Sequence, residues 1–175
     1  MFRNRSFQYN GKWVNRETVP DSSRHLHASD ATITRDCHMS EFSIADAETR
    51  LREEFSPWIH ELGICFEKIA SGTAVLRVPR SARLNRGGGT ICGQAIMSLA
   101  DTAMAFAVAA SVGEWVPLTT VSQSSAFLRP AGDEDLIAEA RIIKPGRTIM
   151  YGEVNLHTGL PEKSIAHVTS TYMLL

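Results

Sequence analysis

Residues 91–112 read ICGQAIMSLADTAMAFAVAASV, and almost every side chain in this run is small or apolar. Its many alanines favour an α-helix and allow neighbouring backbone to approach closely. A surface helix carries charges along one side, whereas this run holds a single charged residue, Asp101, near its middle. The run therefore predicts a long helix that is buried nearly all round, with one carboxylate at or inside the core.

Asp101 is the first candidate for a catalytic group. A buried carboxylate costs free energy unless it is paired, hydrogen-bonded or protonated. Carboxylates in such surroundings are often functional. The alternative is structural, in which Asp101 sits at the rim of the core and caps a helix or forms an ion pair.

Composition excludes several classes of protein. A chain of 175 residues fits one domain with one core, and a net charge of -1 gives no bias toward nucleic acid. Cys37, Cys65 and Cys92 lie far apart without a CxxC pair, which argues against a disulfide framework or a metal site and fits the cytoplasm. Residues 91–112 are long enough to span a bilayer, but Asp101 makes insertion costly, so no membrane partner is predicted.

The chain divides into an extension and a domain. Residues 1–38 hold scattered arginines and aromatics, with Asn10-Gly11 and Pro20 but no sustained periodicity. We expect a poorly ordered N-terminal extension, followed by one domain over residues 39–175. An arginine-rich transit peptide is the alternative for the extension, and a start at Met39 would leave a complete domain.

The order of predicted elements indicates the fold class. Residues 43–46 (SIAD) resemble a capping box that opens a helix, and the proline and glycine of residues 144–147 (KPGR) predict a type II turn. Alternation predicts strands at residues 73–78 and 136–143, and β-branched composition predicts one at 118–128. Further strands are predicted between the turns, at residues 64–69, 148–156 and 164–174. We therefore predict an α+β fold, an antiparallel sheet wrapped around one central helix.

The start of the central helix offers a second functional feature. Glycines 87–89 are flexible, and the helix amides near Gly93 suit an anion or a developing oxyanion. Asp101 lies about 12 Å further along the same helix, so one protomer does not easily bring both groups to one carbonyl. Two antiparallel helices do, and the apolar flank of the helix also predicts a homodimer or a dimer of dimers (homotetramer).

Several sequence blocks occur in a specific order and spacing. They are residues 88–94 (GGTICGQ), 99–101 (LAD), 119–121 (TTV), 127–130 (FLRP), 145–148 (PGRT) and 166–172 (AHVTSTY). From Trp58 onward the chain resembles the hotdog-fold acyl-CoA thioesterases of the phenylacetate-degradation (PaaI-like) group. The resemblance implies a hotdog fold, an acyl-CoA substrate, and no cofactor or metal.

The resemblance also implies roles for individual residues. Asp101 matches the helix carboxylate that acts as general base or nucleophile, and Gly93 matches the amide that polarises the thioester carbonyl. Thr120 matches a hydroxyl that positions the water or carboxylate, and Asn85 corresponds to the family's asparagine if one extra glycine is allowed. Residues expected along coenzyme A are Gly89, Cys92, Gln94, Arg129, Gly146 and Arg147.

The helix start departs from the family pattern, because Cys92-Gly93-Gln94 replaces a frequent His-Gly-Gly. The side-chain donor is thus missing or replaced by a weak thiol. Cys92 as a thiolate nucleophile is an alternative to a packed, inert cysteine. Met97 and Met104 are predicted as core filling, and Ala95, Ala103 and Phe106 are candidates for the pocket lining.

We predict an acyl-CoA thioesterase. The alternatives are a non-catalytic acyl-CoA-binding hotdog protein, a hotdog hydratase or dehydratase, and a purely structural assembly module. A hydratase usually needs a histidine beside a carboxylate, and the helix start contains none. A structural module has no use for Asp101 in the middle of the helix.

Overall fold

The structure, a computed structural model, describes residues 7–9, 12–14, 42–132 and 134–175. Its contacts divide the chain into two units, Met1–Cys37 and His38–Leu175. The first unit contains an antiparallel pair of short strands, β1 (Phe7–Tyr9) and β2 (Lys12–Val14). The predicted poor order of residues 1–38 and the predicted start at residue 39 fall largely outside the described residues.

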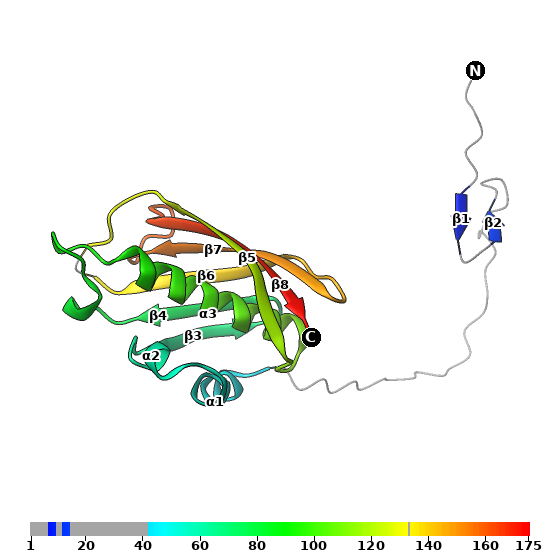
Figure 1. Cartoon of the computed structure of the whole chain (residues 1–175), viewed down its shortest axis with the longest axis horizontal. Coiled ribbons are helices and arrows are strands. Elements are labelled where there is room, and N and C mark those ends of the chain that lie inside the picture. The colour runs from blue at the N-terminus through cyan, green and yellow to red at the C-terminus, as the bar shows by residue number, and fades with distance from the viewer. Residues whose placement is uncertain (1–6, 10–11, 15–41, 133) are drawn as a thin grey trace, which may run out of the picture. The chain divides into compact units, whose positions relative to one another are not determined.

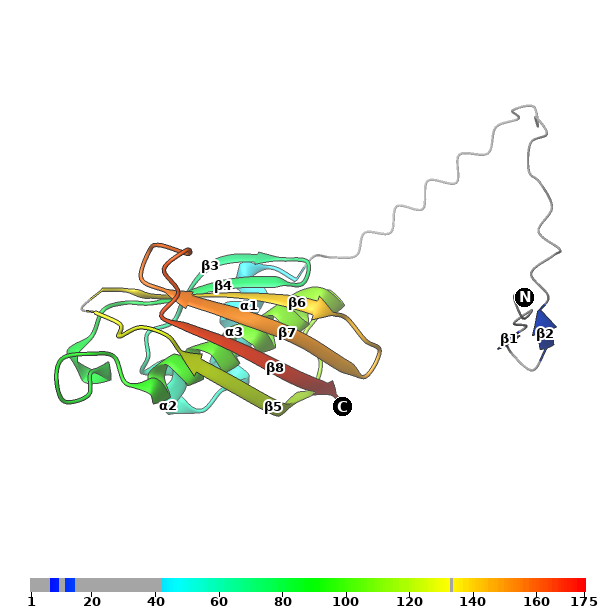
Figure 2. The same cartoon turned by 90° about the horizontal axis from the view of Figure 1, so that it is seen from above.

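The second unit is an antiparallel sheet that curves around one helix, as Figures 1 and 2 show. The strand order is β3-β4-β6-β7-β8-β5, so β3 and β5 form the two edges. The strands are β3 (Cys65–Ala70), β4 (Thr73–Val78), β5 (Leu118–Phe127), β6 (Leu136–Lys144), β7 (Ile149–His157) and β8 (Ala166–Leu174). This confirms the predicted α+β hotdog architecture.

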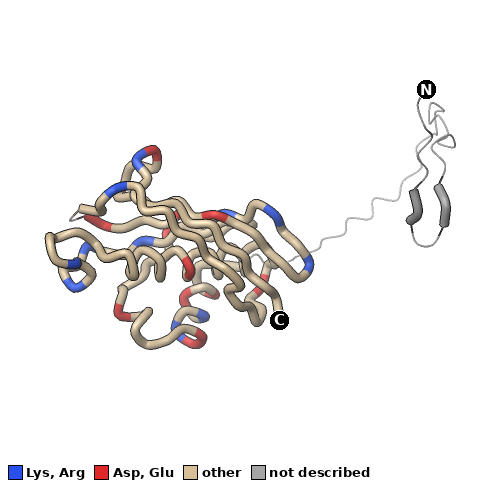
Figure 3. The backbone as a smooth tube through the Cα atoms, turned by 45° about the horizontal axis from the view of Figure 1, so that its top comes forward, with Lys and Arg blue, Asp and Glu red and all other residues tan. Residues whose placement is uncertain are grey.

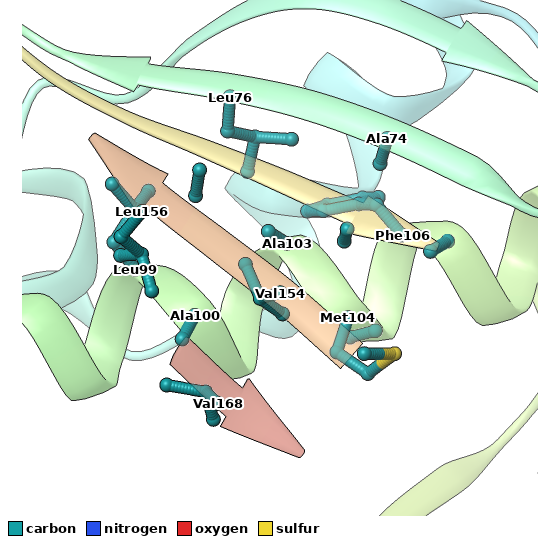
Figure 4. Close-up of a cluster of buried hydrophobic side chains, with 14 of the residues drawn as sticks. Ala74, Leu76, Leu99, Ala100, Ala103, Met104, Phe106, Val154, Leu156 and Val168 are labelled. Atoms are coloured by element: carbon teal, nitrogen blue, oxygen red, sulfur yellow. The ribbon is translucent and has the colours of Figure 1, made fainter. Parts of the chain in front are cut away.

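The central helix is α3 (Gly93–Val112), and all its residues from Thr102 to Ala110 are buried. Alternate strand residues point toward it, because successive strand side chains face opposite sides of a sheet. Figure 4 shows Leu99, Ala103 and Met104 of α3 packed against strand residues such as Leu76, Val154 and Val168. The helix is apolar because both the sheet and the helices before it cover its surface.

Helix α3 is also long and apolar enough to cross a membrane by composition, and it is the one such helix in the described part of the chain. However, 72% of its most apolar 18-residue window is buried inside the protein. The helix therefore forms the core of a soluble domain, as the polar residues within it predicted.

Two helices precede the sheet and frame one end of α3. Helix α1 (Ile44–Glu54) begins with the predicted capping box: the Ser43 hydroxyl accepts from the Asp46 amide at 3.2 Å, and the Asp46 carboxylate accepts from the Ser43 amide at 2.9 Å. Helix α2 (Pro57–His60) restarts at a proline. Phe55, between them, stacks on Phe106 of α3 with ring centroids 5.4 Å apart.

Two predictions of local structure are wrong. The type II turn needs a positive φ at Gly146, and Gly146 does not have one. A glycine is needed there for space, since a Cβ would collide with the carbonyl oxygen of Ile149. Met104 is buried as predicted, but Met97 is 41% exposed because it lies on the side of α3 that the sheet leaves open.

Candidate active site

The Asp101 carboxylate is held by two hydroxyl groups from the sheet. Thr120 Oγ1 donates a hydrogen bond to Asp101 Oδ1 at 2.9 Å, and the Tyr172 hydroxyl donates to the same oxygen at 2.6 Å. The Tyr172 hydroxyl also lies 2.8 Å from the backbone oxygen of Asp101. Asp101 Oδ2 has no hydrogen-bond partner among the described residues. One carboxylate oxygen is therefore fixed and the other is available.

Strand register explains why these groups meet. Thr120 of β5 is paired directly with Tyr172 of β8, so both side chains project from the same face of the sheet toward α3. Gln123, further along β5, also reaches the helix and donates to the backbone oxygen of Met97 at 3.3 Å. Side chains of the edge strand β5 thus form hydrogen bonds with the exposed side of α3 around Asp101.

Tyr172 is a functional residue that the sequence reasoning did not single out. It is 1% exposed, and burial, then the charge of Asp101 and the hydrogen bond to it, raise the pKa of Tyr172 above its ordinary value. The phenol therefore stays protonated and acts as a donor. The available signal was the β8 alternation of Val168, Ser170 and Tyr172, which predicts that all three face the core.

Asp101 lies between two clefts. One is a cleft of about 450 Å³ lined by Glu54, Phe55, Ser56, Trp58, Ile59, Met97, Ser98, Asp101, Thr102, Thr120 and Gln123. The other, of about 400 Å³, is lined by Glu54, Phe55, Asp101, Ala105, Trp115, Pro117, Leu118, Thr119, Thr120, Tyr172 and Leu175. Both contain Asp101 and Thr120, so a group bound in either cleft reaches the carboxylate. The remaining lining of the first cleft mixes polar and apolar side chains, and that of the second is largely apolar.

The start of α3 lines a different cleft. Cys92 is the N-cap residue but supplies no side-chain acceptor, and the amides of Gly93 and Gln94 have no partner among the described residues. The cleft, of about 470 Å³, is lined by Arg86, Thr90, Ile91, Gly93, Ile96, Phe127, Leu128, Arg129, Pro130 and Ala131. Unpaired helix amides beside two arginines give this cleft a positive potential.

Of the predicted site residues, the structure brings Asp101 and Thr120 together at the middle of α3. It brings Gly93 and Arg129 together at the start of α3. The two pairs lie apart, since eight residues of one continuous helix, about 12 Å, separate Gly93 from Asp101.

The remaining predicted residues do not line these three clefts. Asn85 forms a β-bridge with Ile91, which places it beside the helix start. Gly89 and Gln94 are exposed next to the same point, and Cys92 is a free, half-buried thiol. Gly146 and Arg147 lie in the turn between β6 and β7, at the other end of the sheet.

No histidine lines these three clefts, and neither do the helix residues that the sequence offered for the pocket lining. His157 lies 3.6 Å from Glu139 and His167 lies 3.0 Å from Glu153, while His60 contacts the backbone oxygen of Leu51. Ala95, Ala103 and Phe106 are buried in the core and do not line the clefts. Among the described residues, no group of three His, Cys, Asp or Glu residues is arranged to hold a metal.

Comparison with known proteins places the chain in a family. Residues 88–164 match the family model of the thioesterase superfamily. A Halobacterium salinarum protein named as a presumed esterase is 31% identical over 102 residues, which cover 55% of this chain and 67% of that protein. This chain belongs to the thioesterase superfamily, whose general chemistry is the hydrolysis of acyl thioesters.

Solved structures agree with this assignment. A mutant of the phenylacetic acid degradation protein PaaI from Thermus thermophilus is 26% identical, with a TM-score of 0.61 over 69% of this chain and 100% of that chain. A thioesterase family protein from Silicibacter pomeroyi is 25% identical, with a TM-score of 0.65 over 74% of this chain and 98% of that chain. The predicted resemblance to PaaI-like hotdog thioesterases is confirmed.

Proposed function

We propose that this protein hydrolyses an acyl-CoA thioester to a free acid and coenzyme A in the cytoplasm, with Asp101 as the reacting carboxylate. The observation that carries the proposal is the Asp101 carboxylate itself. One of its oxygens is anchored by Thr120 and Tyr172, the other has no hydrogen-bond partner among the described residues, and Asp101 lines both clefts.

Two routes to hydrolysis fit this carboxylate. As a general base, Asp101 takes a proton from water while the water oxygen attacks the thioester carbonyl carbon, and the C–S bond then breaks. As a nucleophile, an Asp101 oxygen attacks that carbon and expels the thiolate, and water hydrolyses the resulting anhydride. In both routes the Gly93 amide donates to the carbonyl oxygen as negative charge develops there.

The site that we propose is shared by two protomers. In one protomer, Thr120 beside Asp101 lies near one end of β5, and Phe127, which contacts Gly93, lies at the other end. The outer edge of β5 has no partner strand in the described chain. If two β5 edges pair antiparallel, each Thr120 end faces the partner's Phe127 end. The Asp101 of one protomer then faces the Gly93 amide of the other. The two groups can therefore reach the same thioester although they lie far apart along one helix.

Arginines near the start of α3 suit the phosphates of coenzyme A. The loop of residues 79–92 carries Arg80, Arg83 and Arg86, and Figure 3 shows basic residues gathered there. Arg86 lines the cleft at the helix start with Arg129, whose guanidinium donates to the backbone oxygen of Ser164 at 2.7 Å. Gly89, Cys92 and Gln94 adjoin this cleft in the chain. Pairing through β5 also brings the sheet end with Gly146 and Arg147 toward the partner's helix start.

We further propose that two dimers associate through the other face of the sheet. Ile143, Ile149 and Tyr151 remain 48%, 46% and 38% exposed there, and pairing through the β5 edge does not cover them. Exposed apolar residues that lie close together indicate a protein contact. Native mass spectrometry distinguishes the tetramer from the dimer.

Thiol release from short, aryl and long acyl-CoAs tests the proposed activity, with Asp101→Asn beside wild type. The amide keeps the shape of the carboxylate but cannot accept the proton, so we expect kcat/KM to fall about 10³-fold with the melting temperature unchanged. Wild type that releases no thiol from any substrate but binds acyl-CoA saturably would establish the non-catalytic binding protein instead.

A hydratase or dehydratase is the less supported alternative. That chemistry usually pairs a histidine with a carboxylate, whereas His60, His157 and His167 contact groups that do not line the three clefts described above. Incubation with an enoyl-CoA, followed by mass spectrometry, yields the free unsaturated acid and coenzyme A but no 3-hydroxyacyl-CoA if the thioesterase proposal is correct.

A further inference from the structure

The two oxygens of Asp101 are in different environments. Oδ1 accepts from both Thr120 and Tyr172, whereas Oδ2 accepts from no described residue. The other hydroxyls beside Asp101 on α3 are engaged elsewhere: Ser98 donates to the backbone oxygen of Gln94, and Thr102 donates to that of Ser98. Within the described chain, the orientation of the carboxylate therefore depends on the two sheet hydroxyls.

We propose that Tyr172 is a positioning residue that fixes Asp101 so that Oδ2, and not Oδ1, takes the proton from water or attacks the thioester. This inference rests on the proposed thioesterase function. The Tyr172 hydroxyl keeps its own proton and is hydrogen-bonded to Asp101, so it acts through Asp101.

The geometry of Tyr172 suits this role better than that of Thr120. Its hydroxyl lies within hydrogen-bond distance of both Oδ1 and the backbone oxygen of Asp101, at 2.6 and 2.8 Å. One rigid, buried ring therefore ties the carboxylate to the helix backbone. The χ2 torsion of an aspartate is otherwise broad, so without this contact the plane of the carboxylate can turn and its free oxygen is no longer held in one position.

The hydrogen bonds also make the two oxygens chemically unequal. An oxygen that already accepts two hydrogen bonds has less electron density to offer than one that accepts none. In the general-base route the water proton therefore passes to Oδ2 while the water oxygen bonds to the carbonyl carbon. In the nucleophilic route Oδ2 forms the new C–O bond as the C–S bond breaks.

The test compares Tyr172→Phe with Tyr151→Phe, which removes the same hydroxyl from a tyrosine on the opposite face of the sheet. For Tyr172→Phe we expect kcat to fall about 10- to 100-fold with KM changed less than about threefold, because positioning affects the reaction more than binding. Tyr151→Phe should keep wild-type constants. A merely structural role for Tyr172 predicts a lower melting temperature with kcat unchanged, and that result overturns the proposal.

Two further measurements separate this inference from the proposed function. In an Asp101→Asn background, Tyr172→Phe should lower kcat by less than about twofold, because a residue that acts through Asp101 has nothing left to position. Crystal structures of the two phenylalanine variants provide a readout without turnover. The Asp101 carboxylate should rotate in Tyr172→Phe and stay in place in Tyr151→Phe. If wild type hydrolyses no thioester, the proposed function fails, while an unrotated carboxylate in Tyr172→Phe refutes the positioning role.

Discussion

The middle and the start of α3 contribute to the proposed site in different ways. At the middle, a charged side chain is fixed by Thr120 and Tyr172. At the start, Gly93 offers only its backbone amide, and the N-cap Cys92 supplies no side-chain bond. The carboxylate therefore depends on which amino acid stands at position 101. The amide donor depends only on where the helix begins, because every residue except proline has a backbone N–H. A side-chain substitution removes the carboxylate, but only the loss of a backbone N–H group removes the donor.

Proline at position 93 is the substitution that tests the helix start. Gly93 is the first residue of α3, where proline is tolerated because its N–H has no helical partner. Cys92 already has the extended conformation, φ -71° and ψ 148°, that a following proline requires. We expect Gly93→Pro to fold and to lower kcat by about 10²- to 10³-fold, as loss of an oxyanion donor does.

Gly93→Ala is the matched control for this variant. A Cβ at position 93 would lie 3.2 Å from Phe127 Cζ, and both variants introduce that contact. The ring of Phe127 is 52% exposed and can move aside. Alanine keeps the amide, so its kcat should stay within about threefold of wild type. Equal losses in the two variants would mean that crowding against Phe127, and not the missing donor, causes the effect.

Mixed dimers test whether the two ends belong to different protomers. Asp101→Asn and Gly93→Pro are each inactive alone, but a heterodimer keeps one site with an intact Asp101 and an intact Gly93. Random mixing of refolded or co-expressed chains should therefore restore about a quarter of wild-type activity, as expected for a two-fold symmetric shared site. If mixing restores nothing although mass spectrometry detects heterodimers, both groups act within one protomer.

Residues whose roles depend on local sequence were predictable. The apolar run with one aspartate predicted α3 and Asp101, and the capping box and hairpin patterns predicted α1, β3 and β4 close to their observed bounds. Gly93 and Thr120 followed from the family resemblance. The contact of Thr120 with Asp101 is confirmed as geometry, while their catalytic roles stay predictions.

Features that depend on contacts between elements far apart in the sequence were not predictable. Tyr172 lies 71 residues from Asp101 in the chain, and the packing of β8 against α3 brings them together. Met97 looked like core filling because its neighbours are apolar, but the sheet leaves that side of α3 open. The turn at Gly146 was mispredicted because a close approach by the Ile149 carbonyl, and not a positive φ, requires the glycine.

Glu153 provides the closest comparison with Asp101 on the outer face of the sheet. It also accepts from two neighbouring strands, but its donors are Arg141 and His167. The hydrogen bond from Arg141, followed by that from His167, holds the pKa of Glu153 below its ordinary value. Because the pKa of Glu153 is lower in the folded state, its ionised carboxylate stabilises that state at pH values above the unfolded-state pKa, which lies near 4.5. This stabilisation is lost as the pH falls through the folded-state pKa.

Glu153→Gln should therefore change stability and leave catalysis alone. Because Arg141 is 67% exposed, solvent screens the pair, and we expect a loss of about 1 kcal/mol at pH 7, or about 2–4 °C in melting temperature. Wild type and variant should converge in thermal scans once the pH falls below the lowered folded-state pKa of Glu153, where the carboxyl is protonated in both states. Its kcat should stay within about twofold of wild type. A tenfold loss of kcat would show that the outer face is coupled to the site, whereas equal melting temperatures at pH 7 would mean that desolvation offsets the ion pair.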